Sequence, residues 1–278
     1  MEKSVKDAQQ KRSCAYCGGT ELTREHLIPQ GYFDRTGRAA EFVANIKAGA
    51  ADKIVSVEPT ISDVCRNCNN DILSRLDSYF LVLFDRYFTN IVVSGKQIRV
   101  EFNFDELLRW LLKMGYNMGR ARQWDGIQNL AGCKDYIRLG EPRPSNITVL
   151  VQAVTPGTPG GTELDTALAS GFIAINAMRV PRIVKNFAFV LQVGIQCYQF
   201  YVLLHHPETN GSERRMRVKA FQRVFRGTYE VCPSRPIMKI YPSSITLWGL
   251  LSGPLWNAGW AQHLRHYFGK RGTNGKPK

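Results

Sequence analysis

The sequence predicts a mixed α+β protein, and three observations along the chain lead to this class. Two Cys-x-x-Cys pairs near the N-terminus frame a short strand-like segment and are followed by a helical pattern. Beyond about residue 95, strand-like runs separated by turns are typical of a mainly antiparallel sheet. With 278 residues, 44% of them hydrophobic, the chain is long enough for about two domains, each with a core.

The two cysteine pairs predict a bound metal ion. Cys14 and Cys17 precede two glycines, which suit a tight turn whose backbone amides fold toward sulfur. Cys65 and Cys68 lie where the helical pattern begins. Four thiolates at this spacing are typical ligands of structural zinc, and four unrelated buried thiols are the alternative. Zinc is therefore an expected cofactor, and it would hold the first turn of the helix against the knuckle.

Between the cysteine pairs, the pattern predicts a β-hairpin. Residues 22–28 alternate weakly and end at Pro29, so they are expected to form a short strand. Residues 31–53 predict an irregular excursion with one helical turn, and residues 54–64 a returning strand that is interrupted at Pro59. Hairpin, knuckle and helix would form a compact, zinc-braced unit.

The helix is expected to run from Asn69 onward, with Asp71 in its first turn, where a carboxylate suits the helix dipole. Asp77 is expected to pair with Arg75, Arg24 or a backbone amide rather than with a metal ion. The apolar residues of this segment recur at three- and four-residue steps, as a buried helical stripe requires: Leu73, Leu76, Phe80, Leu83, Phe84 and Tyr87.

The remainder of the chain predicts an α+β domain. Residues 97–104 alternate like a strand, and residues 105–124 have helical spacing with Asp105 as the N-cap. Further strands are expected at 147–154, 172–178, 187–195 and 197–204. We therefore divide the chain into a flexible basic lead-in, a zinc module with its long helix, an α+β domain and a basic disordered tail: 1–12, 13–94, 95–265 and 266–278.

The charge of the chain favours a polyanionic partner, since 37 Lys and Arg against 23 Asp and Glu give a formal charge of +14. Nucleic acid is the first expectation, and a merely basic surface is the alternative. One basic run alternates with apolar residues over 215–219, which predicts a strand with a positively charged face that is either solvated or in contact with nucleic acid. The candidate contacts are Arg24, Arg214, Arg215, Arg217 and Lys219.

The N-terminus is polar and lacks the apolar core of a signal peptide, and the chain has no uncharged apolar run of about 18 residues. Seven cysteines, an odd number, without an export signal favour reduced thiols that hold metal over disulfides. We therefore expect a cytoplasmic protein without a membrane-spanning segment.

The order of these motifs resembles the HNH endonuclease family over residues 14–80. The similar features are the first Cys-x-x-Cys pair, the segment REHLIP at 24–29 and the segment CRNCNN at 65–70. The resemblance is to the branch of the family with Glu-His in place of Asp-His, and it implies a ββα-metal fold. Thr60 stands about where the family has its middle asparagine, so that asparagine's bracing role is unassigned.

The resemblance also implies a mechanism. His26 would be the general base on water, and Glu25 with Asn69 or Asn70 would hold one catalytic Mg²⁺ or Mn²⁺ ion. Hydrolysis would leave 5′-phosphate and 3′-hydroxyl ends on nucleic acid, with DNA as the expected substrate. Because neighbouring strand residues point to opposite faces, Glu25 and His26 can share one site only if the strand is distorted.

Two other functions remain open from the sequence. The same basic chain could be a noncatalytic zinc-knuckle protein that binds nucleic acid, or a nuclease effector of a defence or mobile-element system that acts only with a partner. The domain at 95–265 could bind DNA, form a homodimer or recognise that partner.

Overall fold

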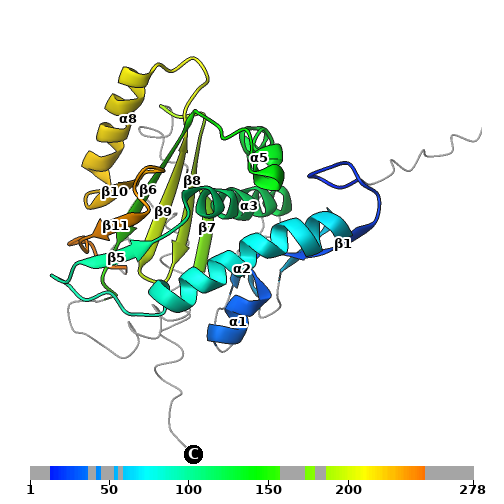
Figure 1. Cartoon of the computed structure of the whole chain (residues 1–278), viewed down its shortest axis with the longest axis horizontal. Helices are drawn as coiled ribbons and strands as arrows, with labels where there is room; N and C mark the ends of the chain where they lie inside the picture. Colours follow the sequence, from blue (N-terminus) through cyan, green and yellow to red (C-terminus); the bar gives the residue numbers. More distant parts are fainter. Residues whose placement is uncertain are drawn as a thin grey trace, which may run out of the picture.

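The computed structural model describes six parts of the chain, with backbone alone for the second and third: 13–36, 42–44, 53–55, 59–156, 173–178 and 186–247 (Figure 1). In these parts, helices combine with mainly antiparallel strands, which confirms the predicted α+β class. The predicted lead-in 1–12 and tail 266–278 lie outside the described residues. In the described part of the chain, no helix is both long and apolar enough to cross a membrane.

The predicted hairpin is present with shorter strands. Strand β1 (Leu22–His26) pairs antiparallel with β4 (Thr60–Cys65). Between them lie helix α1 (Gln30–Thr36), which is longer than the single turn expected, and the antiparallel pair β2 (Phe42–Ala44) and β3 (Lys53–Val55).

A continuous helical segment follows the second cysteine pair, as the apolar spacing predicts. It comprises η1 (Cys68–Leu73), α2 (Ser74–Leu83) and η2 (Phe84–Phe88), of which η1 and η2 have the wider turns of a π-helix. Most of the predicted apolar stripe is buried, whereas Tyr87 is half-buried: Leu73, Leu76, Phe80, Leu83 and Phe84.

Helix α3 (Phe104–Arg122) lies between α2 and the sheet, and it contacts both (Figure 1). Its N-cap is Asn103 rather than the predicted Asp105. The side chain of Asn103 accepts hydrogen bonds from the N–H groups of Asp105 and Glu106, and the carboxylate of Asp105 pairs instead with Arg143. Two short helices follow α3: α4 (Ile127–Ala131) and α5 (Lys134–Leu139).

A five-stranded antiparallel sheet, in the order β10-β6-β9-β8-β7, forms the centre of the second half of the chain. Every residue of β8 and β9 is buried, because α3 covers one face of the sheet and α8 the other. Four of its strands match the predicted runs. The strands are β6 (Ile147–Ala153), β7 (Ile173–Ala177), β8 (Phe189–Ile195), β9 (Tyr198–Leu204) and β10 (Thr228–Val231).

Helix α8 (Gly211–Val224) occupies the basic run, so the predicted strand at 215–219 is wrong. Asn210 caps the helix by accepting a hydrogen bond of 3.0 Å from the N–H of Glu213. The alternation spans only five positions, whereas the apolar residues that pack on the sheet, Val218, Phe221 and Phe225, recur at helical spacing. A separate antiparallel pair completes the described fold: β5 (Ile98–Glu101) and β11 (Ile237–Ile240).

Candidate metal centre and catalytic segment

The four cysteines of the two pairs converge at the start of the helical segment. Their Sγ atoms all lie within 4.8 Å of one another, and those of Cys17 and Cys65 are 3.4 Å apart. Sulfur atoms that share one tetrahedral zinc ion at about 2.3 Å lie roughly 3.8 Å apart. The described cysteine cluster is therefore close enough to hold a structural metal ion and is compatible with a zinc knuckle.

Backbone groups shape the first half of this cluster. Gly18 has a φ of 78°, which L side chains rarely adopt, and its N–H donates to the carbonyl of Cys14 at 2.9 Å. The N–H of Gly19 donates to the Sγ of Cys17 at 3.4 Å. The predicted role of the glycines, to fold amides toward sulfur, is thus visible in the knuckle.

The thiols differ in how readily they ionise. Burial alone would raise the pKa of Cys14, but backbone N–H groups, with that of Cys65 first, lower the pKa to about 7. Burial, followed by the thiols of Cys17 and Cys65, raises the pKa of Cys68. Four sulfurs at this distance would repel one another as thiolates, so a cation is needed to keep all of them ionised.

Asn69 links the helical segment to strand β1. Its Nδ2 donates to the backbone carbonyl of Arg24 at 2.7 Å and to Oγ1 of Thr23 at 2.9 Å. Both amide hydrogens are directed to β1, which leaves the carbonyl oxygen of Asn69 as the group that can bind another ligand. Asn70 is exposed, and its backbone carbonyl accepts the hydroxyl of Ser74. Of the two asparagines, Asn69 is the one that the structure joins to the predicted catalytic segment.

The register of strand β1 shifts between Thr23 and Glu25, whereas Glu25 and His26 pair in regular succession with Ile61 and Thr60, so the distortion that would let these two side chains share one site is not seen between them. Thr23 pairs with Val64 and Glu25 pairs with Ile61, so two steps on β1 face three steps on β4. The side chain environments then diverge: Glu25 is buried with 4% exposure, whereas His26 is partly exposed. Thr60, which stands near the position of the family's middle asparagine, is the strand partner of His26.

The carboxylate of Glu25 takes part in a buried ion cluster that the sequence did not predict. Nζ of Lys113 lies 2.7 Å from Oε1 of Glu25 and 2.7 Å from both carboxylate oxygens of Asp77. The predicted partners of Asp77 are therefore wrong, because the fully buried Lys113 satisfies both oxygens. Burial alone would lower the pKa of Lys113, but Asp77 and then Glu25 raise it above its ordinary value. The one available signal was a lysine inside the apolar stripe of α3.

The candidate nucleic-acid contacts divide into two groups. Arg24, Arg215 and Lys219 are exposed. Arg214 instead donates to the backbone carbonyls of Thr209 and Ser145 at 2.8 and 2.5 Å, so its guanidinium links α8 to the segments that carry these two residues. Arg217 bonds to Glu213 and to a backbone carbonyl. Two cations of the basic run are thus used within the protein.

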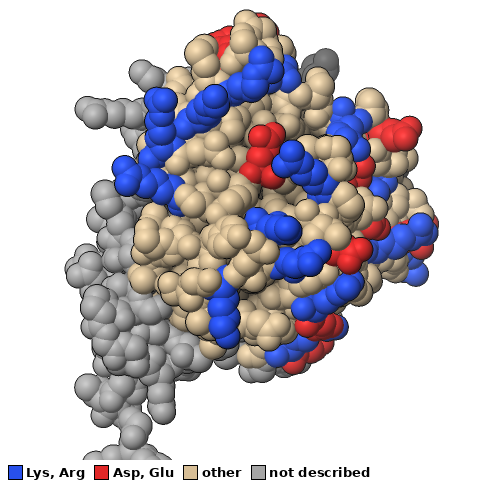
Figure 2. Space-filling model, turned by 60° about the vertical axis from the view of Figure 1, so that its left-hand side comes forward, with Lys and Arg blue, Asp and Glu red and all other residues tan. Residues whose placement is uncertain are grey.

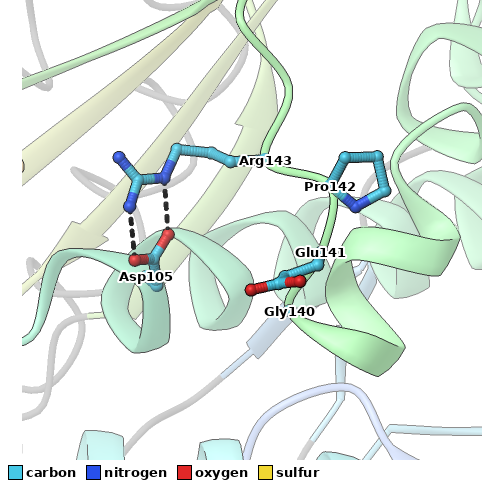
Figure 3. A pocket seen from close by; sticks show the side chains of 5 residues that line it. All are labelled: Asp105, Gly140, Glu141, Pro142 and Arg143. Atoms are coloured by element: carbon cyan, nitrogen blue, oxygen red, sulfur yellow. Dashed lines mark hydrogen bonds and ion pairs between the residues drawn. The ribbon is translucent and has the colours of Figure 1, made fainter.

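A hollow of about 510 Å³ lies beside the N-terminal end of α3 (Figure 3). It is lined by Asp105, Gly140, Glu141, Pro142 and Arg143. Arg143 donates to both oxygens of Asp105, at 2.7 and 2.6 Å. Burial tends to raise the pKa of Asp105, but the bonds from Arg143 and Tyr136 hold it below its ordinary value. The carboxylate of Asp105 and the guanidinium of Arg143 thus satisfy each other at the wall of the hollow.

In comparisons with protein-family models, curated proteins and solved structures, no match to the chain was found. The functional argument therefore depends on the chain's own residues. The domain boundaries, the cytoplasmic location and a homodimer or protein partner remain predictions.

Proposed function

We propose that the protein is a metal-dependent endonuclease of the HNH type that hydrolyses phosphodiester bonds in nucleic acid, with DNA as the first substrate to test. The observation that carries this proposal is the link from Asn69 to the backbone of Arg24, next to Glu25 and His26. The thiol cluster lies at the start of the same helical segment. The hairpin, the start of the helix and the thiol cluster are the parts from which a ββα-metal arrangement would be built, and their contacts support the proposal.

The types of residue present suit one hard cation and a general base. The carbonyl oxygen of Asn69 and a carboxylate oxygen of Glu25 are donors of the kind that Mg²⁺ and Mn²⁺ prefer. Because Lys113 and Asn117 both donate to Oε1 of Glu25, Oε2 is the oxygen left for an ion. A bound ion would offset the charge that develops on the scissile phosphate. His26, which is partly exposed, would take the proton from the attacking water.

Helix α8 supports a polyanionic substrate. Arg215, Lys219 and Arg223 are exposed and recur every four residues, a rise of about 6 Å per step. Among the described residues, none forms an ion pair or hydrogen bond with these three side chains. The opposite side of α8 is fixed on the sheet by Val218 and Phe221. The three cations therefore form a stripe that faces solvent.

A second basic feature lies on the strand pair β5 and β11, where Arg99 and Lys239 stand directly opposite each other and are both exposed. Like charges at opposite positions of two strands destabilise the pairing, and a polyanion would relieve the repulsion. Elements α8, β5 and β11 lie on the side of Figure 1 that Figure 2 brings forward, where Lys and Arg side chains are prominent.

The test is cleavage of supercoiled plasmid with Mg²⁺ or Mn²⁺, comparing the wild-type protein with His26→Ala. Loss of a general base is expected to lower the cleavage rate by about 10²-fold or more, with zinc content and DNA affinity unchanged. His206→Ala, which removes a partly exposed histidine outside the candidate site, is the matched control and should cleave normally. Equal cleavage by wild type and His26→Ala would contradict the proposal, as would a wild-type protein that cuts neither DNA nor RNA with either ion.

One observation favours a second function, a noncatalytic zinc-knuckle protein that binds nucleic acid. Glu25 is buried and already neutralised by Lys113, so the cluster is complete without a divalent ion. Under this alternative, the wild-type protein and His26→Ala bind DNA equally and neither cuts it. The plasmid assay therefore separates the two functions.

A further inference from the structure

One side of helix α3 bonds to four different elements of the N-terminal region. The residues involved are spaced by three, four and three positions, which places them on one face of the helix: Trp110, Lys113, Asn117 and Arg120. Trp110 bonds to Asp77 on α2, and Lys113 bonds to Glu25 on β1. Asn117 bonds to Tyr16 in the knuckle, and Arg120 bonds to Asp63 on β4.

The centre of this face has almost no access to water. Lys113 and Asn117 are 0% exposed, and Glu25 is 4% exposed. Buried ions are tolerated only when they are paired and hydrogen-bonded, and removing one partner leaves an uncompensated charge. Two carboxylates share the ammonium of Lys113 here, so the lysine is the group on which the placement of both depends.

The bonds to Glu25 converge on a single atom. Nζ of Lys113 lies 2.7 Å from Oε1, and Nδ2 of Asn117 donates to the same oxygen at 3.2 Å. Asn117 is itself held, because its Oδ1 accepts the hydroxyl of Tyr16 at 2.7 Å and the guanidinium of Arg120 at 3.1 Å. Two fixed donors on one oxygen set the rotamer of the carboxylate and direct the other oxygen elsewhere.

We propose that Lys113 is a positioning residue of the candidate catalytic centre: with Asn117, it fixes the carboxylate of Glu25 so that Oε2 can bind the catalytic cation. This inference rests on the proposed function. It assigns a residue of α3 to the candidate catalytic centre. Helix α3 follows the motifs at 14–80 and lies after residue 94, the predicted end of the zinc module. The N-terminal module alone would then lack a residue that its own carboxylate requires.

The decisive comparison is between Lys113→Met and Asp77→Asn. Both substitutions remove the ion pair between Lys113 and Asp77, but only Lys113→Met releases Glu25. A lysine that merely stabilises the fold would make the two variants alike in cation binding. A positioning lysine makes them differ, because Asp77→Asn leaves Lys113 and Asn117 on Glu25.

The experiment uses the full-length, zinc-loaded protein and measures Mn²⁺ binding by electron paramagnetic resonance, then plasmid cleavage against Mn²⁺ concentration. Lys113→Met is expected to weaken Mn²⁺ binding by about 10-fold or more, and Asp77→Asn by less than about 3-fold. The Mn²⁺ concentration for half-maximal cleavage should shift by the same factors. Near-ultraviolet circular dichroism and zinc content check that each variant is folded.

Asn117→Ala is the second variant, in case Lys113→Met does not fold, because it removes one of the two donors to Oε1 while keeping the ammonium. It should weaken Mn²⁺ binding in the same direction by a smaller factor. Wild-type affinity in whichever of these variants folds would overturn the inference, as would equal weakening by Asp77→Asn. If the wild-type protein cuts plasmid while the variants bind Mn²⁺ normally, the inference alone fails. If the wild-type protein neither binds Mn²⁺ nor cuts, the proposed function fails with it.

Discussion

The N-terminal region and the five-stranded sheet share one apolar core, but the N-terminal region adds a cluster of thiols and buried ions to it. Around β1 and the helical segment, thiols and buried ions contribute the defining contacts, as in the sulfur cluster and the pairing of Glu25 with Lys113. In the sheet, β8 and β9 are buried at every position between two helices. Apolar packing is insensitive to chelators and ion binding, whereas sulfur and carboxylate contacts are not. The candidate chemistry thus lies in the region whose structure depends on ionised groups.

The largest expected effect comes from removing the structural metal. We expect about one zinc ion per chain, and we expect a chelator or Cys65→Ser to unfold the N-terminal region, because binding of a structural metal supplies folding free energy. Zinc analysis, limited proteolysis and thermal melting measure this. Cys133→Ser is the matched control, since Cys133 is a buried thiol outside the cluster and should leave zinc content unchanged. A metal-free protein with the melting profile of the zinc-loaded one would show that the cluster does not stabilise the region.

The second effect tests the other side of the comparison, where α3 meets the sheet. A Cβ atom at Gly115 would lie 2.4 Å from a methyl carbon of Leu191, so Gly115→Ala should destabilise the protein by about 1–3 kcal/mol through overpacking. Leu191 is fully buried on β8, and Leu191→Ala should cost about 2–5 kcal/mol through the cavity that it leaves.

The double variant sharpens this test, because Leu191→Ala removes the atoms with which the new methyl group would collide. Its loss of unfolding free energy should therefore be smaller than the sum of the two single losses. All three variants should retain zinc, as measured after purification. Additive losses would mean that Gly115 and Leu191 do not share one contact, and loss of zinc would mean that the two regions are not held independently.

The same contrast explains what the sequence could predict. Residue spacing reports local structure, so the cysteine cluster and most strands of the sheet were expected, and the apolar stripe of α2 marked a buried helix. Contacts between distant segments leave no such periodicity. Lys113 and Glu25 are 88 positions apart and meet only in the folded protein, so no local pattern predicts their ion pair. The alternation at 215–219 covers too few residues to distinguish a strand from a helix, and Phe221, which packs on the sheet, lies beyond it.

The smallest effect on stability concerns α8, and it tests whether the sheet region holds the nucleic acid on which the N-terminal region acts. Arg215→Gln with Lys219→Gln should change the free energy of unfolding by less than about 0.5 kcal/mol per site, since both side chains are exposed. In DNA-binding titrations at several salt concentrations, the slope of log K against log salt should fall by about 1.8, which corresponds to two lost phosphate contacts. Adding Arg223→Gln should lower it by about one unit more.

The matched control for this series is Lys134→Gln with Arg138→Gln on α5, which removes the same charge from the formal net charge of +14. Binding is measured in the His26→Ala background, so that cleavage does not enter. If the control lowers the slope as much as the α8 variant, the attraction comes from overall charge and α8 is an ordinary solvated helix face. If only the α8 variant lowers it, the cations that do not bond within the protein are the ones that contact phosphate. Arg214 and Arg217 would then not be phosphate contacts, because their guanidinium groups already bond to backbone carbonyls.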